Sequence, residues 1–211
     1  WNIIKDKPQE VADHYEKLWN EMNNDDMRGD QSYKRSYYEN VRERYNKEHD
    51  PLDFMFIDRT CFNGLIRYNS KGEFNSPYHL NRNGIRPNVL RTIVSEWSDL
   101  LKLNDVRFNC NSYDNISPKC NDFIYLDPPY ANTNGMYNGD FDNDGFFKWL
   151  KELKCKFALS YDGISGETDN TYKVPSDVYD KHVYVKSGNS SFKRIKQSDN
   201  NAIVYESLYL G

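Results

Sequence analysis

The tetrapeptide Asp127-Pro128-Pro129-Tyr130 follows the apolar run 123–126, which the sequence predicts to be a buried strand. Two consecutive prolines cannot donate backbone hydrogen bonds, so they end the strand and leave their carbonyls as acceptors beside the Asp127 carboxylate. Tyr130 adds an aromatic face. The turn can therefore accept both hydrogens of an exocyclic amine and stack on the flat ring that carries it. An adenine lifted out of a duplex presents such a group.

A simpler interpretation is a strand that happens to end in Pro-Pro, with Asp127 capping the turn. A short motif gains weight from its structural context, here a strand followed directly by a turn. The apolar lead-in at 123–126 supplies that context and favours a functional turn.

The elements that must position this turn alternate between helix and strand. Helices are predicted at 8–23, 33–47, 52–62, 87–103 and 146–153, and strands at 106–108, 123–126, 157–161, 183–185 and 202–208. Residues 163–166 are predicted to form a loop, and residues 187–201 a polar, basic loop between the last two strands. Such alternation indicates an α/β sheet with its sites at the carboxyl ends of the strands.

A second informative stretch, residues 63–78, predicts a β-hairpin. Residues 67–69 and 73–75 flank Ser70-Lys71-Gly72, which suits a turn. A hairpin of this kind fits a major groove, where Arg pairs with guanine and Asn with adenine, while Tyr can stack on or support an extruded base. By itself the stretch could equally be an ordinary surface hairpin.

The run 37–78, with Val41-Arg42-Glu43-Arg44-Tyr45-Asn46 and Asn63-Gly64-Leu65-Ile66-Arg67-Tyr68-Asn69, resembles a known recognition region. It is similar to that of DNA adenine-N6 methyltransferases of the Dam and EcoRV-methylase type, the D12 class with the Asp-Pro-Pro-Tyr motif. In that family the hairpin enters the major groove. The resemblance implies DNA contacts from Asn63, Arg67, Tyr68, Asn69 and Lys71, and a weaker candidate in Tyr78.

The resemblance also implies the fold and the cofactor. We expect an α/β, Rossmann-like sheet that depends on S-adenosylmethionine (AdoMet), with an inserted, mainly helical DNA-recognition domain that carries the hairpin. The recognition domain would span residues 1–86, and the C-terminal part of the catalytic domain residues 87–211. Asp127, Pro128, Pro129 and Tyr130 would be catalytic, and Asp127, Ser112 and Tyr113 would bind AdoMet. No metal is expected.

The glycine-rich Phe-x-Gly-x-Gly turn of such enzymes, and the acidic residue that holds the cofactor ribose, do not occur in the sequence. We expect that an N-terminal segment of roughly 30 residues, or about twice that, belongs before Trp1, because a strand-turn-helix-strand unit has at least that size. The gene could be truncated, the segment removed or disordered in the sample, or a second chain could supply it. The chain as written is then expected to bind AdoMet poorly.

Three functions remain open at this point. The first is a site-specific adenine methyltransferase of a restriction-modification system or phage, with double-stranded DNA and a cognate restriction endonuclease as partners. The second is a non-enzymatic DNA-binding remnant of such an enzyme. The third is an RNA or protein amino-methyltransferase, whose turn more often begins with Asn; the hairpin argues against it.

The composition bounds these functions. The 211 residues suit one substantial domain or a domain with a sizeable insertion. Because the formal net charge is −4, phosphate contacts of a DNA-binding protein would have to come from local clusters of cations. Arg59, Arg67 and Lys71 lie in one such stretch. The four cysteines have neither zinc-ligand spacing nor a disulfide framework. With no apolar stretch of membrane-spanning length and no signal pattern, we expect a cytoplasmic protein without a membrane partner.

Overall fold

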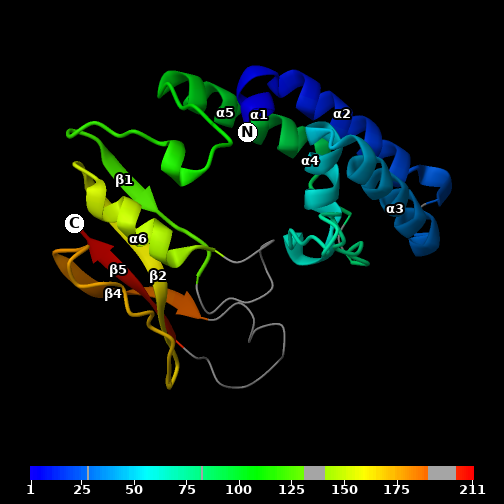
Figure 1. Ribbon diagram of the computed structural model, residues 1–211. Helices are drawn as coiled ribbons and strands as arrows, with labels where there is room; N and C mark the ends of the chain where they lie inside the picture. Colours follow the sequence, from blue (N-terminus) through cyan, green and yellow to red (C-terminus); the bar gives the residue numbers. More distant parts are fainter. Residues whose placement is uncertain (28, 82, 131–140, 190–202) are drawn as a thin grey trace. The chain divides into compact units, whose positions relative to one another are not determined.

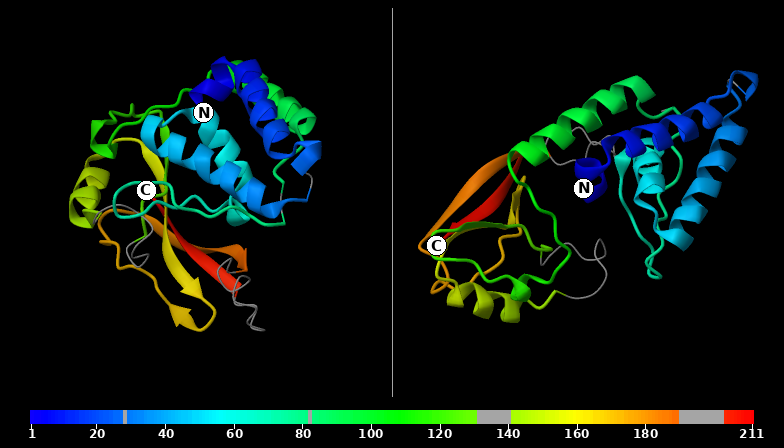
Figure 2. Two further views of the ribbon diagram at one scale, coloured as in Figure 1. Left: turned by 90° about the vertical axis from the view of Figure 1, so that its right-hand side faces the viewer. Right: turned by 90° about the horizontal axis from the view of Figure 1, so that it is seen from above.

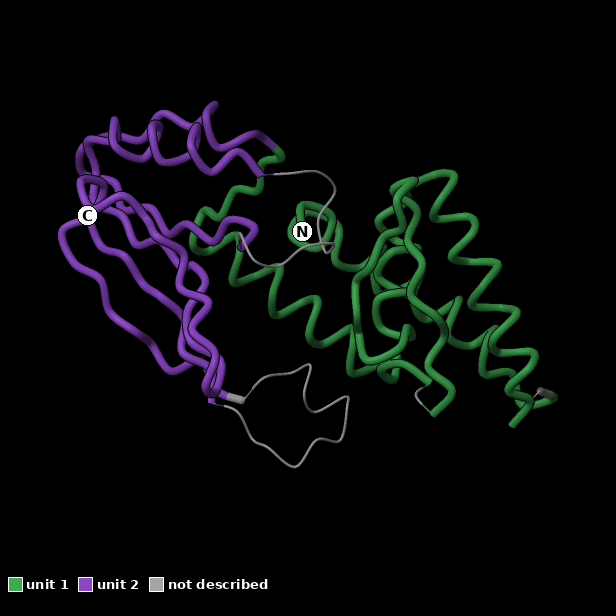
Figure 3. Tube along the Cα trace, turned by 60° about the horizontal axis from the view of Figure 1, so that its bottom comes forward, with its two compact units in different colours: residues 1–110 green, residues 111–211 purple. Residues whose placement is uncertain are grey.

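The computed structural model of the chain describes residues 1–27, 29–81, 83–130, 141–189 and 203–211, drawn in colour in Figure 1. They form two compact units, residues 1–110 and residues 111–211 (Figure 3). The sequence predicted a boundary at 86/87 instead. The difference comes from α5 (Pro87–Leu103), which packs against α1 (Asn2–Asp6) and α2 (Pro8–Met22) and so belongs to unit 1.

Unit 1 is helical in its regular elements. Besides α1, α2 and α5 it contains η1 (Asp25–Met27), α3 (Gln31–Glu48), α4 (Pro51–Thr60) and η2 (Phe62–Gly64). The predicted helices at 8–23, 33–47, 52–62 and 87–103 are confirmed. Prolines open α2, α4 and α5, because the first helical turn does not need their missing N–H group. Buried side chains of α2 follow the helical repeat and face α4 and α5.

The core of unit 1 is rich in aromatic rings. Tyr15, Tyr38 and Phe56 are fully buried, and they come from α2, α3 and α4 respectively. Burial of each large ring stabilises the unit by roughly 1.5–3 kcal/mol. Tyrosine side chains therefore form a substantial part of the core of this unit.

The predicted strand at 106–108 is wrong. Residues 104–110 carry no regular structure, and the segment packs on α1 instead. The Lys5 ammonium donates to the Val106 carbonyl at 2.6 Å, and the Phe108 ring stacks on Trp1 at 5.7 Å between centroids. Strand propensity at Val106-Arg107-Phe108 thus gives way to tertiary contacts.

Unit 2 is a mixed α/β unit. It contains η3 (Tyr113–Asn115), β1 (Phe123–Leu126), α6 (Asn143–Glu152), β2 (Lys156–Ser165), β3 (Thr168–Asp169), β4 (Lys181–Asn189) and β5 (Ile203–Leu210). In the part of the chain that the structure describes, the strand order is β1-β2-β5-β4, with β3 paired to β2. β1 and β2 are parallel and are joined through α6, while β5 is antiparallel to both of its neighbours. Figure 2 shows α6 running along one side of this sheet.

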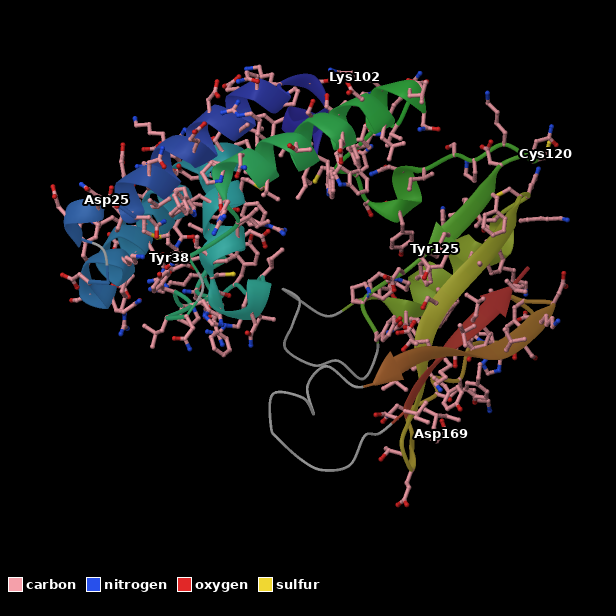
Figure 4. The ribbon with its side chains drawn as sticks, turned by 180° about the vertical axis from the view of Figure 1, so that it is seen from behind. Asp25, Tyr38, Lys102, Cys120, Tyr125 and Asp169 are labelled. Carbon is pink, nitrogen blue, oxygen red and sulfur yellow. The ribbon has the colours of Figure 1, made fainter. Side chains whose placement is uncertain are left out.

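The strands and the helix predicted around the Pro-Pro turn are confirmed, with two corrections. The run 123–126 was predicted to be buried, but only Ile124 and Leu126 pack toward the core, while Phe123 and Tyr125 are 64 % and 60 % exposed (Tyr125 is labelled in Figure 4). Residues 163–165, predicted to be loop, continue β2, and Ile164 and Ser165 pair with β5 beyond a bulge. The predicted basic loop 187–201 lies mostly outside the described residues.

Two further properties bear on function. None of the helices in the described ranges is both long and apolar enough to cross a membrane. The four cysteines are free thiols, two of them buried and two exposed.

Candidate active site and nucleic-acid interface

The Asp127-Pro128-Pro129-Tyr130 turn begins directly after β1, at the carboxyl end of the strand. Leu126 pairs in parallel register with Leu159 of β2, which brings the start of the turn level with Ser160. Asp127 is exposed, and its side chain bonds to none of the residues that the structure describes, whereas both prolines and Tyr130 are half-buried. The structure thus presents the carboxylate to solvent beside a partly enclosed aromatic ring.

Tyr130 is held from two sides. Its hydroxyl lies 2.9 Å from the Ser160 hydroxyl, and its ring packs against Tyr161 at 5.9 Å between centroids. Burial raises the pKa of Tyr130 to about 12, so the phenol is neutral at physiological pH. The ring is therefore fixed as a neutral aromatic surface next to Asp127. Sequence reasoning missed Ser160, although its position directly after Leu159 in a predicted strand could have indicated it.

Ser112 and Tyr113 lie at the start of η3, in the same unit as the turn. Tyr113 is half-buried, and its ring contacts Phe146 and Trp149 of α6, each at 5.2 Å between centroids. Burial raises the pKa of the Tyr113 hydroxyl. Tyr113 and Tyr130 pack against the same core cluster, and Ser112 is exposed. The three predicted cofactor residues, Ser112, Tyr113 and Asp127, thus belong to one unit, and Tyr113 packs against its core.

The predicted hairpin is confirmed in unit 1. Tyr68 and Phe74 form an antiparallel bridge, and the Asn69 amide donates to the Glu73 carbonyl at 2.9 Å. Gly72 has a left-handed backbone with φ of 77°, which the turn requires and a residue with a side chain rarely adopts. Arg67, Tyr68 and Lys71 are exposed on this hairpin, as a DNA-contacting surface requires.

Three of the predicted DNA contacts, Arg67, Tyr68 and Asn69, have intramolecular hydrogen-bond partners. The Tyr68 hydroxyl lies 3.2 Å from the Tyr45 hydroxyl of α3. The Arg67 Nε donates to the Asn75 side-chain oxygen at 2.7 Å, which orients the guanidinium, and sequence reasoning missed this partner. The Asn69 side-chain oxygen accepts from the Lys71 and Glu73 amides at 2.9 and 3.0 Å and so holds the turn. Asn63, exposed in η2, has a left-handed backbone with φ of 56°.

Tyr78 does not lie on the exposed surface. Its side chain is 5 % exposed and packs against Tyr38 at 5.6 Å between centroids. Phe74, Ser76 and Tyr78 are all buried, so alternate residues of this extended segment face the core. The burial argues against the predicted DNA contact of Tyr78, and this alternation was the signal that could have revealed it.

Within the residues that the structure describes, no group of three or more His, Cys, Asp or Glu side chains gathers to hold a metal ion. The groups that the structure brings together at the end of β1 are instead acceptors and aromatic rings.

The family model described as "D12 class N6 adenine-specific DNA methyltransferase" matches residues 1–196. The chain belongs to this family. The mixed sheet of unit 2 is consistent with an AdoMet-dependent methyltransferase fold. The Asp-Pro-Pro-Tyr turn and the hairpin are therefore parts of a D12-class chain.

Individual relatives of this D12-class chain agree with the family assignment. It is 30 % identical over 153 residues to the type II methyltransferase M.MjaIII of Methanocaldococcus jannaschii, covering 62 % of this chain and 51 % of that protein. It is 35 % identical over 101 residues to the DNA adenine methylase of Escherichia coli, covering 45 % of this chain and 34 % of that protein. With the modification methylase StsI of Streptococcus sanguinis it shares 33 % identity over 135 residues, 56 % of this chain and 20 % of that protein. The matches thus span about half the length of these relatives or less.

Proposed function

We propose that the protein methylates N6 of an adenine that is extruded from duplex DNA, with AdoMet as the methyl donor. The observation that carries the proposal is the turn at the end of β1, where an exposed Asp127 stands beside the fixed ring of Tyr130. Membership of the D12 class supports the same reaction.

The chemistry follows from the groups in the turn. The lone pair of an exocyclic adenine amine is delocalised into the ring, so the amine is a poor nucleophile until its hydrogens are held. Asp127 and the Pro128 carbonyl accept those two hydrogens. As positive charge develops on nitrogen, the Asp127 carboxylate stabilises it, and the amine releases one proton to water during or after methyl transfer. Asp127 acts here as an electrostatic stabiliser more than as a strong base.

Tyr130 supplies the surface on which the extruded base stacks. Stacking offsets part of the few kcal/mol that extrusion costs. The Ser160 hydroxyl at 2.9 Å and the Tyr161 ring restrict the Tyr130 ring, so less rotational freedom is lost when the base arrives.

Ser112, Tyr113 and Asp127 are the residues that we assign to AdoMet. The half-buried Tyr113 ring, backed by Trp149, forms an apolar wall that fits an adenine ring, and the exposed Ser112 and Asp127 side chains fit polar groups around it. When bound, AdoMet supplies an electrophilic methyl group. The part of the chain that the structure describes does the rest: it orients the amine and stabilises its charge.

In this proposal unit 1 recognises the DNA. Unit 2, with its Rossmann-like sheet, catalyses the methyl transfer. The hairpin enters the major groove, where the outer edge of the Arg67 guanidinium reads guanine while Asn75 holds its Nε. Lys71 at the exposed tip contacts phosphate, and Asn63 and Tyr68 lie on the same exposed segment. M.MjaIII is named as a type II methyltransferase, and we therefore include a restriction-modification context with a cognate endonuclease.

Replacement of Asp127 tests the reaction. Asp127→Ala in the full-length protein should lower methyl transfer at least about 10³-fold, because the developing charge loses its stabilising carboxylate, while DNA binding is retained. Transfer of a labelled methyl group from AdoMet to duplex DNA measures the reaction rate, and a titration with DNA measures the binding affinity.

Asp180→Ala is the matched control, since Asp180 is an exposed aspartate of the same unit, just before β4. Wild-type turnover in Asp127→Ala would contradict the proposed role of Asp127. A wild-type protein that binds DNA but transfers no methyl group would instead favour the non-enzymatic DNA-binding protein.

A further inference from the structure

Helix α3 carries three polar side chains, Tyr38, Arg42 and Asn46, spaced four residues apart along one face. All three hydrogen-bond the backbone of the second hairpin strand. The Tyr38 hydroxyl and the Arg42 Nη1 donate to the Ser76 carbonyl at 2.8 and 3.1 Å. The Asn46 side chain bonds Phe74 twice: its Nδ2 donates to the Phe74 carbonyl at 3.1 Å, and its Oδ1 accepts from the Phe74 amide at 2.7 Å.

The double bond to Asn46 follows from the register of the hairpin. The Tyr68–Phe74 bridge is flanked by two backbone bonds, Asn69 N to Glu73 O and Asn75 N to Arg67 O, each at 2.9 Å. Tyr68 and Phe74 are thus a non-hydrogen-bonded pair, so the amide and carbonyl of Phe74 point away from the first strand. The Asn46 carboxamide hydrogen-bonds both the amide and the carbonyl of Phe74, as the backbone of a third strand would.

These bonds fix the residue that holds Arg67. Asn75 lies between Phe74 and Ser76, the two residues that α3 hydrogen-bonds. Its side-chain oxygen accepts from Arg67 Nε at 2.7 Å, and its carbonyl lies 3.3 Å from Arg67 Nη2. A shift of the strand against α3 would therefore move Asn75 and the guanidinium together.

The residues of the hairpin that bond α3 are buried, whereas the side chain that faces the proposed DNA is exposed. Phe74 and Ser76 are 1 % and 0 % exposed, and Tyr38 is fully buried among the helices of unit 1 (Figure 4). Arg67, by contrast, is exposed. The backbone groups that bond α3 thus belong to buried residues, while the side chain that they orient faces outward.

We propose that α3 is the positioning helix of the recognition hairpin, and that Asn46 is a positioning residue that sets how accurately Arg67 reads its base. The inference rests on the proposed DNA-methyltransferase function. Asn46 itself touches no DNA in this scheme and acts through Phe74, Asn75 and Arg67.

The first test needs no DNA. Amide hydrogen exchange of Phe74 and Asn75 in the full-length protein should accelerate at least about fivefold in Asn46→Ala, because both bonds between Asn46 and Phe74 are lost, although those of Tyr38 and Arg42 to Ser76 remain. Asn40→Ala is the matched control, an exposed asparagine on the same helix, and should leave the exchange unchanged. Unchanged exchange in Asn46→Ala would overturn the positioning role whatever the protein does.

The second test measures specificity. Duplexes carry the target sequence, identified by methylation sequencing, or single base-pair changes in it. Asn46→Ala should lower the ratio of kcat/KM between target and altered duplex about tenfold at the base pair where Arg67→Ala also loses discrimination. A merely unstable protein would lose activity on every duplex by the same factor and keep the ratio.

The double variant decides whether Asn46 acts through Arg67. Asn46→Ala combined with Arg67→Ala should discriminate no worse than Arg67→Ala alone, whereas additive losses would overturn the proposal. If Asn46→Ala does not fold, Asn46→Asp takes its place, since it keeps the acceptor for the Phe74 amide and loses only the donor. A wild-type protein without methylation activity would refute the proposed function, and the exchange measurement would still judge the role of Asn46.

Discussion

Asp53 illustrates how single residues hold unit 1 together. Its side chain is 1 % exposed, on α4, and it accepts from His14 Nε2 of α2 at 2.9 Å and from Arg44 Nη2 of α3 at 2.6 Å. Burial by itself would raise the pKa of Asp53, but the hydrogen bonds from Arg44 and His14 outweigh it and lower the pKa below its usual range. One carboxylate thus ties three helices together.

We expect Asp53→Asn to lower the free energy of unfolding of unit 1 by about 2–3 kcal/mol at neutral pH. The value lies below the roughly 3–5 kcal/mol for breaking a fully buried pair, because Arg44 is 42 % exposed. Since the folded pKa is depressed, this stabilisation is present above the usual carboxyl value near about 4 and is lost as pH falls through the folded value.

Urea unfolding of the wild type and the variant at pH about 7 and about 3 measures both effects. The exposed Asp26 provides the control, since Asp26→Asn should change little at either pH. Equal stability of Asp53→Asn and wild type at neutral pH would show that the cluster adds nothing to folding.

At the scale of elements, the bulge in β2 is the sharpest constraint on the sheet of unit 2. The pairing of β2 with β5 shifts register between Tyr161 and Ile164, and Gly163 lies in the gap. A Cβ atom at Gly163 would lie 2.1 Å from the Tyr205 carbonyl oxygen, which is backbone and cannot move aside cheaply. The bulge therefore requires glycine for the close approach of two strands.

Gly163→Ala should accordingly destabilise unit 2 by about 2–3 kcal/mol, the upper part of the range for overpacking. Thermal unfolding followed by circular dichroism measures the loss. Gly72→Ala in the hairpin is the comparison variant. It would strain the backbone, because Gly72 has φ of 77°, but it would cause no steric clash, because the space around Gly72 is open. That variant should leave the sheet of unit 2 intact, and a wild-type melting point for Gly163→Ala would refute the tight approach.

Elements with a strong repeat were predictable from sequence, and those set by tertiary contacts were not. Helices α2 and α5 show their apolar periodicity in the sequence, and the Pro-Pro pair marks the end of β1. Residues 106–108 are of types that favour strands, but contacts with Lys5 and Trp1 hold the segment outside any sheet.

The same contrast applies to the candidate sites. The hairpin was predictable from its turn residues, whereas Tyr38, Arg42 and Asn46 look like a solvated polar face until their hairpin partners are known. The Tyr130–Ser160 contact joins residues 30 apart in sequence and needed the parallel register of β1 and β2.

At the scale of the whole chain, two separate cores correspond to two tasks. The core of unit 1 gathers side chains from α2 to α5, and that of unit 2 gathers side chains from α6, β1, β2, β5 and the segment 172–179. In the proposed function, unit 1 reads DNA and unit 2 carries out chemistry. Since each unit has its own core, damage to one core should stay within its unit.

We expect Phe56→Ala to lower the stability of unit 1 by about 3–5 kcal/mol, because this fully buried ring leaves a cavity among Tyr15 and Tyr37. Native-state hydrogen exchange should show the loss of protection in residues 1–110 and leave the strands of unit 2 protected. A uniform loss across both units would indicate a single cooperative fold instead. The exposed ring of Tyr125 in unit 2 offers a control, Tyr125→Ala.

The amide of Asn46 on the outer edge of the hairpin has a consequence for engineering new specificities. If residues 63–78 of this chain were moved alone into another protein, they would leave behind the Asn46 donor and acceptor that close the edge of the hairpin. The amide and the carbonyl of Phe74 would then lack their partners on α3. The portable cassette of this protein is the hairpin together with α3, and chimeras should be cut before Gln31 rather than before Asn63.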